Sequence, residues 1–310
     1  SQLLFVSCQS FMIIVGDPQN KSLSESISSK LGVKPIYPEI TVFPDSEQRV
    51  RIPSKITGEK VYLLKSIMAP VDSSVLQLSF TVDALVKNGA DKVIGIIPYI
   101  PYMRADHMFR TGEAVPLEVV IKMIEDSGLH EIIIIDPHSI KIPEMFKIPV
   151  HNLSALSLFA KKIKELTAIR DLTIVSPDTG GIRRLEQLDE LLGGANKVVI
   201  NKDRNLESGE VRVAEFEGKI KGKCFIIDDI ISTGKTVLQA INTLIQNGAE
   251  EVYVFGTHPV FSEDADRLLE GSKAKKIYVT DSIPVPPEKN FAKLEILSIA
   301  ELITDAIKDV

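Results

Sequence analysis

Short apolar runs alternate along the chain with segments of helical periodicity. The runs are continuously apolar, which is typical of strands that are covered on both faces in parallel sheets. They cover residues 12–16, 60–67, 92–99, 131–136, 172–178, 197–203, 224–229 and 251–258. The pattern therefore predicts an α/β fold that is built from βαβ units.

Two segments of the chain resemble each other. ALVKNGADKVIGIIP (84–98) and TLIQNGAEEVYVFGT (243–257) both contain a helix that closes on Asn-Gly and then an apolar strand. Glycine suits the left-handed conformation in which many helices end. Any two βαβ units share some of this pattern, but we interpret the echo as two similar α/β domains.

The domain boundaries follow from this echo. We expect an N-terminal domain over 12–152 and a C-terminal domain over 153–292, with the junction near HNLSA at 151–155. The C-terminal stretch 293–310 has amphipathic helical periodicity, and we expect this helix to pack on the first domain. Residues 1–11 precede Met12, which opens a strand, so we expect them to be a non-native or disordered extension.

Composition narrows the class of protein. The 310 residues are 44% hydrophobic and 25% charged, as in globular proteins. The net charge is −6 with scattered Lys and Arg, which argues against a nucleic-acid partner. No apolar run approaches the roughly 20 residues that span a bilayer. Cys8 and Cys224 have neither metal-ligand spacing nor enough partners for a disulfide framework, which favours a reducing, cytoplasmic setting.

The stretch FIIDDIISTGKTVLQ at 225–239 contains the chemistry that is easiest to interpret. A P-loop would need a glycine five positions before Gly234, where Asp229 stands. A tight Ser-Thr-Gly loop before a helix is instead suited to a phosphate monoester. Two carboxylates are good acceptors for vicinal hydroxyls, so the combination predicts a ribose phosphate site. A single Asp here would more commonly end a strand or cap a helix.

IIDDIISTGKT resembles the PRPP-binding signature of type I phosphoribosyltransferases and of their relatives, the ribose-phosphate pyrophosphokinases (PRPP synthetases). The resemblance implies phosphoribosyltransferase-like domains, each a mainly parallel sheet flanked by helices. It implies that Asp228 and Asp229 bind the ribose hydroxyls. It also implies that the 5-phosphate is bound by Ser232, Thr233, Gly234, Lys235 and Thr236. Ser232 and Lys235 depart from the acidic residue and the glycine of many synthetases.

Two segments of the first domain resemble the synthetases specifically. FPDSEQRV (43–50) resembles their FxDGE motif, which implies that Phe43, Asp45 and Glu47 hold adenine, often across a subunit contact. IPYIPYMRADHMFRTGEAVP (97–116) resembles their IPYxxYxRQD segment and mobile loop. This second resemblance implies that Arg104 and Asp106 bind ATP, although Ala105 replaces the usual Gln. The short loop is most similar to that of archaeal members.

Three further segments complete the resemblance. IIIIDPHSIKIPEMFKIPVHNL (132–153) implies that His138 meets ATP and its Mg²⁺, and VSPDTGGIRR (175–184) implies that Asp178 binds Mg²⁺ at the ribose 5-phosphate site. INKDRNLESGEV (200–211) implies that Lys202 and Arg204 are catalytic cations beside the transferred group. By the family mechanism, His138 and Asp229 also belong to the catalytic set, and Asp229 or a water assists deprotonation of the ribose hydroxyl.

The resemblance runs from about residue 12 to the C-terminus and identifies the chain as similar to ribose-phosphate pyrophosphokinases. It implies ATP and ribose 5-phosphate as substrates, Mg²⁺ as cofactor, and a homo-oligomer that is a dimer or a hexamer built from dimers. Neither nucleic acid nor a membrane is an expected partner. Two alternatives stay open: a phosphoribosyltransferase that consumes PRPP, and a catalytically silent regulatory homologue.

Overall fold

The computed structural model describes residues 12–204 and 211–310, with the backbone alone for 201–204 and 211–217. The expected extension 1–11 lies outside the described residues. The chain divides into two compact units. Unit 1 comprises the residues up to Leu153 together with Ala300–Val310, and unit 2 comprises Ser154–Ile299.

Unit 1 is built on a five-stranded parallel sheet with strand order β1-β4-β5-β6-β7. Its strands are β1 (Met12–Val15), β4 (Lys60–Leu64), β5 (Lys92–Ile96), β6 (Glu131–Ile135) and β7 (Val150–Leu153). The four isoleucines 132–135 of β6 are each at most 1% exposed. The continuous apolar runs are thus buried on both faces, as expected for parallel strands.

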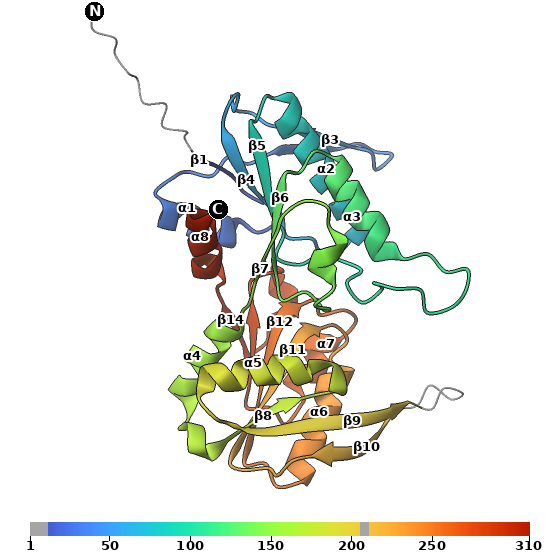
Figure 1. The fold of residues 1–310 in the computed structure, drawn as a ribbon, viewed down its shortest axis with the longest axis vertical. Coiled ribbons are helices and arrows are strands. Elements are labelled where there is room, and N and C mark those ends of the chain that lie inside the picture. Colours follow the sequence, from blue (N-terminus) through green and yellow to red (C-terminus); the bar gives the residue numbers. More distant parts are fainter. Residues whose placement is uncertain (1–11, 205–210) are drawn as a thin grey trace, which may run out of the picture. The chain divides into compact units, whose positions relative to one another are not determined.

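Four helices cover this sheet. They are α1 (Lys21–Leu31), α2 (Val71–Lys87), α3 (Pro116–Asp126) and α8 (Ala300–Asp309). Helices α2 and α3 pack together on one face, and α1 and α8 pack together on the other (Figure 1). The expected helix over 293–310 begins only at Ala300, because Leu294–Leu297 forms strand β14 of unit 2.

A separate antiparallel hairpin projects from unit 1. It pairs β2 (Glu39–Val42) with β3 (Gln48–Arg51), and β3 packs against α2. The hairpin strands have largely exposed side chains, and no apolar run predicted them. Strands β7, β10 (Val211–Glu217), β13 (Lys276–Thr280) and β14 were likewise not among the predicted runs.

Unit 2 has a seven-stranded sheet with order β10-β9-β8-β11-β12-β13-β14, parallel except for the β9–β10 pair. Its strands are β8 (Leu172–Ser176), β9 (Asn196–Arg204), β10 (Val211–Glu217), β11 (Lys223–Ile231), β12 (Glu251–Pro259), β13 (Lys276–Thr280) and β14 (Leu294–Leu297). Its α-helices are α4 (Leu156–Leu166), α5 (Ile182–Leu192), α6 (Lys235–Gln246) and α7 (Ala265–Glu270). Short 3₁₀ helices in the chain are η1 (Ile142–Met145), η2 (Ile169–Asp171), η3 (Thr179–Gly181) and η4 (Pro287–Lys289).

Both units confirm the predicted α/β class, with a mainly parallel sheet between helices in each (Figure 1). The two Asn-Gly caps are also confirmed. Gly89 and Gly248 have φ angles of 86° and 89°. The amide of Ala90 donates to the Leu85 carbonyl at 3.1 Å, and the amide of Ala249 donates to the Leu244 carbonyl at 3.0 Å.

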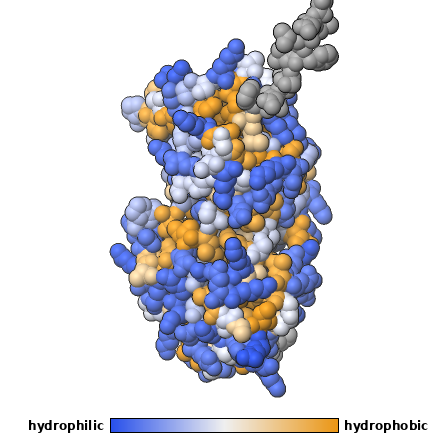
Figure 2. Space-filling view, turned by 90° about the vertical axis from the view of Figure 1, so that its left-hand side faces the viewer, coloured by the Kyte–Doolittle hydropathy of each residue, from blue (hydrophilic) through white to orange (hydrophobic). Residues whose placement is uncertain are grey.

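The face displayed in Figure 2 combines hydrophilic surface with separate apolar patches. Large apolar side chains that reach solvent in unit 1 include Leu76 and Phe80 of α2, which are 43% and 42% exposed. Among the described residues, no helix combines the length and apolarity that crossing a bilayer requires.

Helix α8 is fastened to the unit 1 sheet by two side chains of β4. The hydroxyl of Tyr62, a residue that is 1% exposed, donates to the Ile307 carbonyl at 3.3 Å. The Lys60 ammonium donates to the Val310 carbonyl at 2.9 Å. The last four carbonyls of a helix have no intrahelical partner, so these bonds satisfy groups at the C-terminal end of α8.

We expect Tyr62→Phe to loosen α8 selectively, because it removes the hydroxyl that binds the Ile307 carbonyl. Loss of one such bond costs about 1 kcal/mol. Amide hydrogen exchange over Ala300–Asp309 should accelerate about five-fold, while Tyr253→Phe, which removes a hydroxyl bonded to Glu251 in unit 2, should leave it unchanged. Equal exchange of α8 in Tyr62→Phe and in the unsubstituted protein would contradict this account.

Candidate functional site

The carboxyl ends of adjacent parallel strands gather the predicted ribose phosphate residues of unit 2. Asp178 follows β8, while Asp228 and Asp229 lie within β11, the neighbour of β8 in the sheet. Ligands of open α/β sheets bind beyond this edge. Strand β11 continues to Ile231, two residues further than expected, so the acidic pair belongs to the strand itself.

An arginine that the motif analysis left without a role balances the acidic pair. Arg184 of α5 places its guanidinium nitrogens 3.4 Å from Asp229 Oδ1 and 4.0 Å from Asp228 Oδ1. Burial raises the pKa of Asp228 well above its usual value, and the charge of Asp229 raises it further, while Arg184 opposes the rise. Arg184 is the second arginine of the motif VSPDTGGIRR, and its place in that motif was the signal that could have identified it.

The turn between β8 and α5 brings Arg184 to the acidic pair. Asp178 Oδ1 accepts from the Gly180 amide at 3.0 Å, which caps η3. A Cβ on Gly181 would lie 2.2 Å from Ser176 Oγ and 3.6 Å from an Arg184 nitrogen. A side chain at 181 would therefore displace the Ser176 hydroxyl, which donates to the Asp178 carbonyl at 2.6 Å.

The predicted phosphate loop connects β11 to α6. Ser232 and Thr233 are half-buried, Gly234 adopts a left-handed conformation, and Lys235 and Thr236 begin the helix. In the described part of the chain no side chain caps α6 at its N-terminus. The first amides of a helix have no intrahelical acceptor, so this end can bind an anion.

A second loop touches the phosphate loop. Ser232 Oγ lies 2.9 Å from Ser262 Oγ, and the exposed Lys235 Nζ lies 3.3 Å from Glu263 Oε2. Ion pairs at such exposed positions contribute little, so the Lys235 side chain can exchange Glu263 for another anion at small cost.

The predicted adenine residues lie at the tip of the β2–β3 hairpin in unit 1. Phe43, Asp45 and Glu47 are all exposed, and the guanidinium of Arg49 stands over the Phe43 ring at 5.7 Å. The Phe43 amide donates to the Glu47 carbonyl at 2.8 Å, and the Glu47 amide donates to Asp45 Oδ1 at 3.1 Å. The tip thus has a defined backbone conformation but side chains that face solvent.

A groove of about 510 Å³ lies between the hairpin and α2. Its lining combines acidic and polar side chains of the hairpin with side chains of α2. They are Asp45, Ser46, Glu47, Gln48, Ser73, Leu76 and Phe80. Unit 1 therefore offers a concave surface beside two of the three predicted adenine residues.

The other predicted nucleotide residues of unit 1 follow neighbouring parallel strands. Exposed Arg104 and half-buried Asp106 lie in the loop after β5, and exposed His138 lies in the bend after β6. Asp106 Oδ1 is 2.6 Å from His107 Nδ1. Because β5 and β6 are adjacent, both loops leave the same edge of the sheet.

The predicted catalytic cations lie at the end of β9. The backbones of Lys202 and Arg204 pair with Val213 and Val211 of β10. Their side chains lie outside the part of the chain that the structure describes.

Metal ligation was predicted for His138 and Asp178, which belong to different units. Among the described residues, no group of three or more His, Cys, Asp and Glu side chains is placed to hold a metal ion. Mg²⁺ prefers oxygen ligands and usually keeps several waters and phosphate oxygens, so the Asp178 carboxylate is the ligand type that suits it.

Comparisons with known proteins cover nearly the whole chain. Residues 12–128 match the family model described as the N-terminal domain of ribose phosphate pyrophosphokinase. Residues 207–310 match the model of the phosphoribosyl synthetase-associated domain. The ribose-phosphate pyrophosphokinase of Aquifex aeolicus is 35% identical over 95% of this chain and 94% of its own length.

Further relatives agree. Ribose-phosphate pyrophosphokinase 1 of Streptococcus pneumoniae is 35% identical over 93% of this chain and 90% of its own length. The crystal structure of phosphoribosylpyrophosphate synthetase from Mycobacterium smegmatis has a TM-score of 0.89 and 30% identity, covering 96% of this chain and 97% of that one. The chain belongs to the ribose-phosphate pyrophosphokinase family.

Proposed function

We propose that this protein is a ribose-phosphate diphosphokinase, which transfers the diphosphate of Mg-ATP to the 1-hydroxyl of ribose 5-phosphate and forms PRPP and AMP. The observation that carries this proposal is the sequence of two carboxylates, a short loop and an uncapped helix N-terminus from Asp228 to Lys235. Family membership over nearly the whole length supports the same reaction.

Unit 2 binds the acceptor in this proposal. Carboxylate oxygens of Asp228 and Asp229 accept hydrogen bonds from the ribose hydroxyls, and Asp178 lies at the same site. The 5-phosphate accepts from the loop 232–236, where backbone amides and the helix dipole favour an anion. Arg184 offsets the negative charge of the acidic pair, which reduces its repulsion of an approaching phosphate.

Unit 1 binds the donor in this proposal. Phe43, Asp45 and Glu47 hold the adenine, and Arg104 with Asp106 meets the nucleotide in the loop after β5. Magnesium enters as part of the substrate, Mg-ATP; in unit 1 the residue assigned to it is His138, and in unit 2 it is Asp178. The exposed position of the hairpin tip is consistent with an adenine site completed by a second copy, in a dimer or a hexamer built from dimers.

The reaction is a displacement at the β-phosphorus of ATP. The ribose 1-hydroxyl oxygen bonds to the β-phosphorus, the bond from that phosphorus to the α,β-bridging oxygen breaks, and AMP leaves with the electron pair. The hydroxyl proton passes to Asp229 or to a water. Lys202 and Arg204 stabilise the charge that develops on the bridging oxygens.

Incubation of the purified protein with Mg-ATP and ribose 5-phosphate should yield AMP and PRPP in equal amounts. Each product should depend on the presence of both substrates, because the diphosphate passes directly between them. Quantifying the two products by ion-exchange chromatography tests this. Folded protein that forms neither product would exclude the synthetase, and PRPP consumption with a nucleobase would favour a phosphoribosyltransferase.

Lys202→Ala should lower kcat on the order of 100-fold, by analogy with loss of an oxyanion donor, and should leave ATP affinity largely intact. Lys197→Ala provides a matched control, because Lys197 lies on the same strand β9 and pairs with Asp189 at 2.8 Å. Steady-state kinetics with ATP-binding measurements separates the two effects. Unchanged turnover in Lys202→Ala would show that the residue has no catalytic role.

The affinity for ribose 5-phosphate should fall on acidification through the raised pKa of Asp228, because only the carboxylate accepts two hydroxyl bonds. Asp228→Asn should raise the KM for ribose 5-phosphate by about ten-fold or more at neutral pH. It should also remove this component of the pH dependence. The substrate phosphate titrates near pH 6 in both proteins, so the difference between their profiles isolates Asp228. Parallel profiles would contradict the assignment.

A further inference from the structure

The β2–β3 hairpin needs an anchor outside its own two strands. An isolated two-stranded hairpin is marginally stable in water, and most side chains of β2 and β3 are exposed. The hairpin nevertheless carries the residues to which the proposed function assigns the adenine. Its position is therefore set by contacts at its base, where β3 packs against α2.

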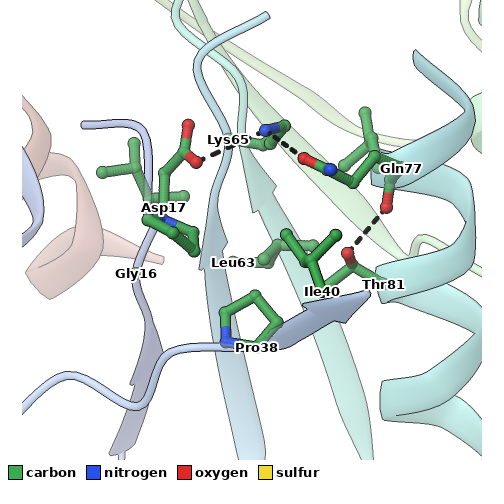
Figure 3. A pocket seen from close by; sticks show the side chains of 11 residues that line it. Gly16, Asp17, Pro38, Ile40, Leu63, Lys65, Gln77 and Thr81 are labelled. Carbon is green, nitrogen blue, oxygen red and sulfur yellow. Dashed lines mark hydrogen bonds and ion pairs between the residues drawn. The ribbon is translucent and has the colours of Figure 1, made fainter. Parts of the chain in front are cut away.

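A buried lysine is connected to the base of the hairpin by hydrogen bonds. Lys65 follows β4 directly and is 4% exposed. Its ammonium donates to Asp17 Oδ1 at 3.3 Å and to Gln77 Oε1 at 2.8 Å, as Figure 3 shows, and also to Gln19 Oε1 at 2.8 Å. An ammonium has three donors and no acceptor, so the hydrogen-bonding capacity of Lys65 is complete.

These hydrogen bonds continue as a chain from Lys65 to the hairpin. Because Lys65 can only donate, Gln77 must present its amide oxygen to the ammonium. The Gln77 nitrogen is then directed to Gln48 Oε1, at 3.0 Å, and the Gln48 nitrogen donates to Ser73 Oγ. Gln48 is the first residue of β3 and directly follows Glu47.

The burial of this cation is not explained by stability alone. Burial lowers the pKa of Lys65, and the nearby Asp17 carboxylate opposes that change. A buried ion pair is often no more stable than an apolar replacement of similar volume. The chain of bonds also reaches the groove, because Gln48 and Ser73 line the groove together with Asp45 and Glu47.

We propose that Lys65 is a positioning residue for nucleotide binding, which acts through Gln77 and Gln48 to hold the β2–β3 hairpin in the orientation that binds adenine. The proposal rests on the adenine role of the hairpin. It makes a specific claim about substrates: loss of the network weakens ATP binding and leaves ribose 5-phosphate binding, which unit 2 performs, unchanged.

Gln77→Leu is the primary test, because Gln77 joins Lys65 to the hairpin but does not line the groove. Thr81→Val is the matched control. Thr81 and Gln77 both line the small cavity that Figure 3 shows. The Thr81 hydroxyl donates to the Gln77 backbone carbonyl at 2.7 Å, but the Thr81 side chain takes no part in the bonds to the hairpin. If Gln77→Leu fails to fold, Gln48→Leu serves instead, since it leaves all three acceptors of Lys65 in place. Because Gln48 lines the groove, hydrogen exchange over the hairpin rather than the KM decides the outcome for that variant.

Two measurements are made on each variant and on the double variant Gln48→Leu/Gln77→Leu. The first is steady-state kinetics with both substrates varied. Loss of one net hydrogen bond predicts a KM for Mg-ATP that is about five-fold higher in Gln77→Leu, with kcat and the KM for ribose 5-phosphate within about two-fold of the unsubstituted values. The KM of the double variant for Mg-ATP should equal that of each single variant, because both substitutions interrupt the same chain of hydrogen bonds.

The second measurement is amide hydrogen exchange over residues 39–51, which requires no activity. Exchange should be faster in Gln77→Leu than in Thr81→Val. If the unsubstituted protein makes no PRPP, the proposed function fails while hydrogen exchange still tests the anchoring. Faster exchange with an unchanged KM for Mg-ATP, an equal rise in both KM values, or the same changes in Thr81→Val would each overturn the proposal.

Discussion

Repulsion between two adjacent carboxylates in one buried strand is the constraint on which the site of unit 2 depends. Asp228 and Asp229 cannot both ionise there without a counter-charge, and Arg184 supplies it from α5. The tight turn after β8 leads into α5, and within it a side chain at Gly181 would displace the Ser176 hydroxyl. The glycine, the arginine and the acidic pair therefore form one interdependent structure, and the pKa of Asp228 reflects how far the counter-charge compensates for burial.

The two units place opposite charges at corresponding positions. Strand β4 precedes the Asn-Gly-capped helix α2, as β11 precedes the Asn-Gly-capped helix α6. The stretches KVYLLKS (60–66) and KCFIIDD (223–229) each begin with a lysine that is followed by four apolar residues. At that point unit 1 has Lys65 where unit 2 has Asp228. A similar scaffold thus holds a cation that pairs with Asp17 in one unit and an acidic pair with an arginine partner in the other.

The sequence predicted those features that depend on local pattern. Continuous apolar runs predicted β1, β4, β5, β6, β8, β9, β11 and β12, and Asn-Gly predicted both helix caps. The hairpin was not predicted as strands, because its residues are exposed and charged. Strands β7, β10, β13 and β14 were not predicted either. Arg184 stood in a quoted motif, but its role depends on a strand that is distant in sequence. Lys65 gave no signal at all, since its acceptors lie 12 to 48 residues away and only the fold brings them together.

The ammonium of Lys65 uses all of its hydrogen-bond donors within the protein, and this limits how unit 1 could bind a nucleotide as proposed. A lysine at the carboxyl edge of a parallel sheet would ordinarily be the first candidate for a phosphate ligand. Here all three of its donors are used by protein oxygens, so a phosphate could recruit it only by displacing a buried carboxylate or a glutamine. In the proposed function, unit 1 therefore takes its ligand groups from segments beyond the strand ends. The exposed hairpin and the loops after β5 and β6 are such segments, and the role proposed for the buried lysine is to orient one of them.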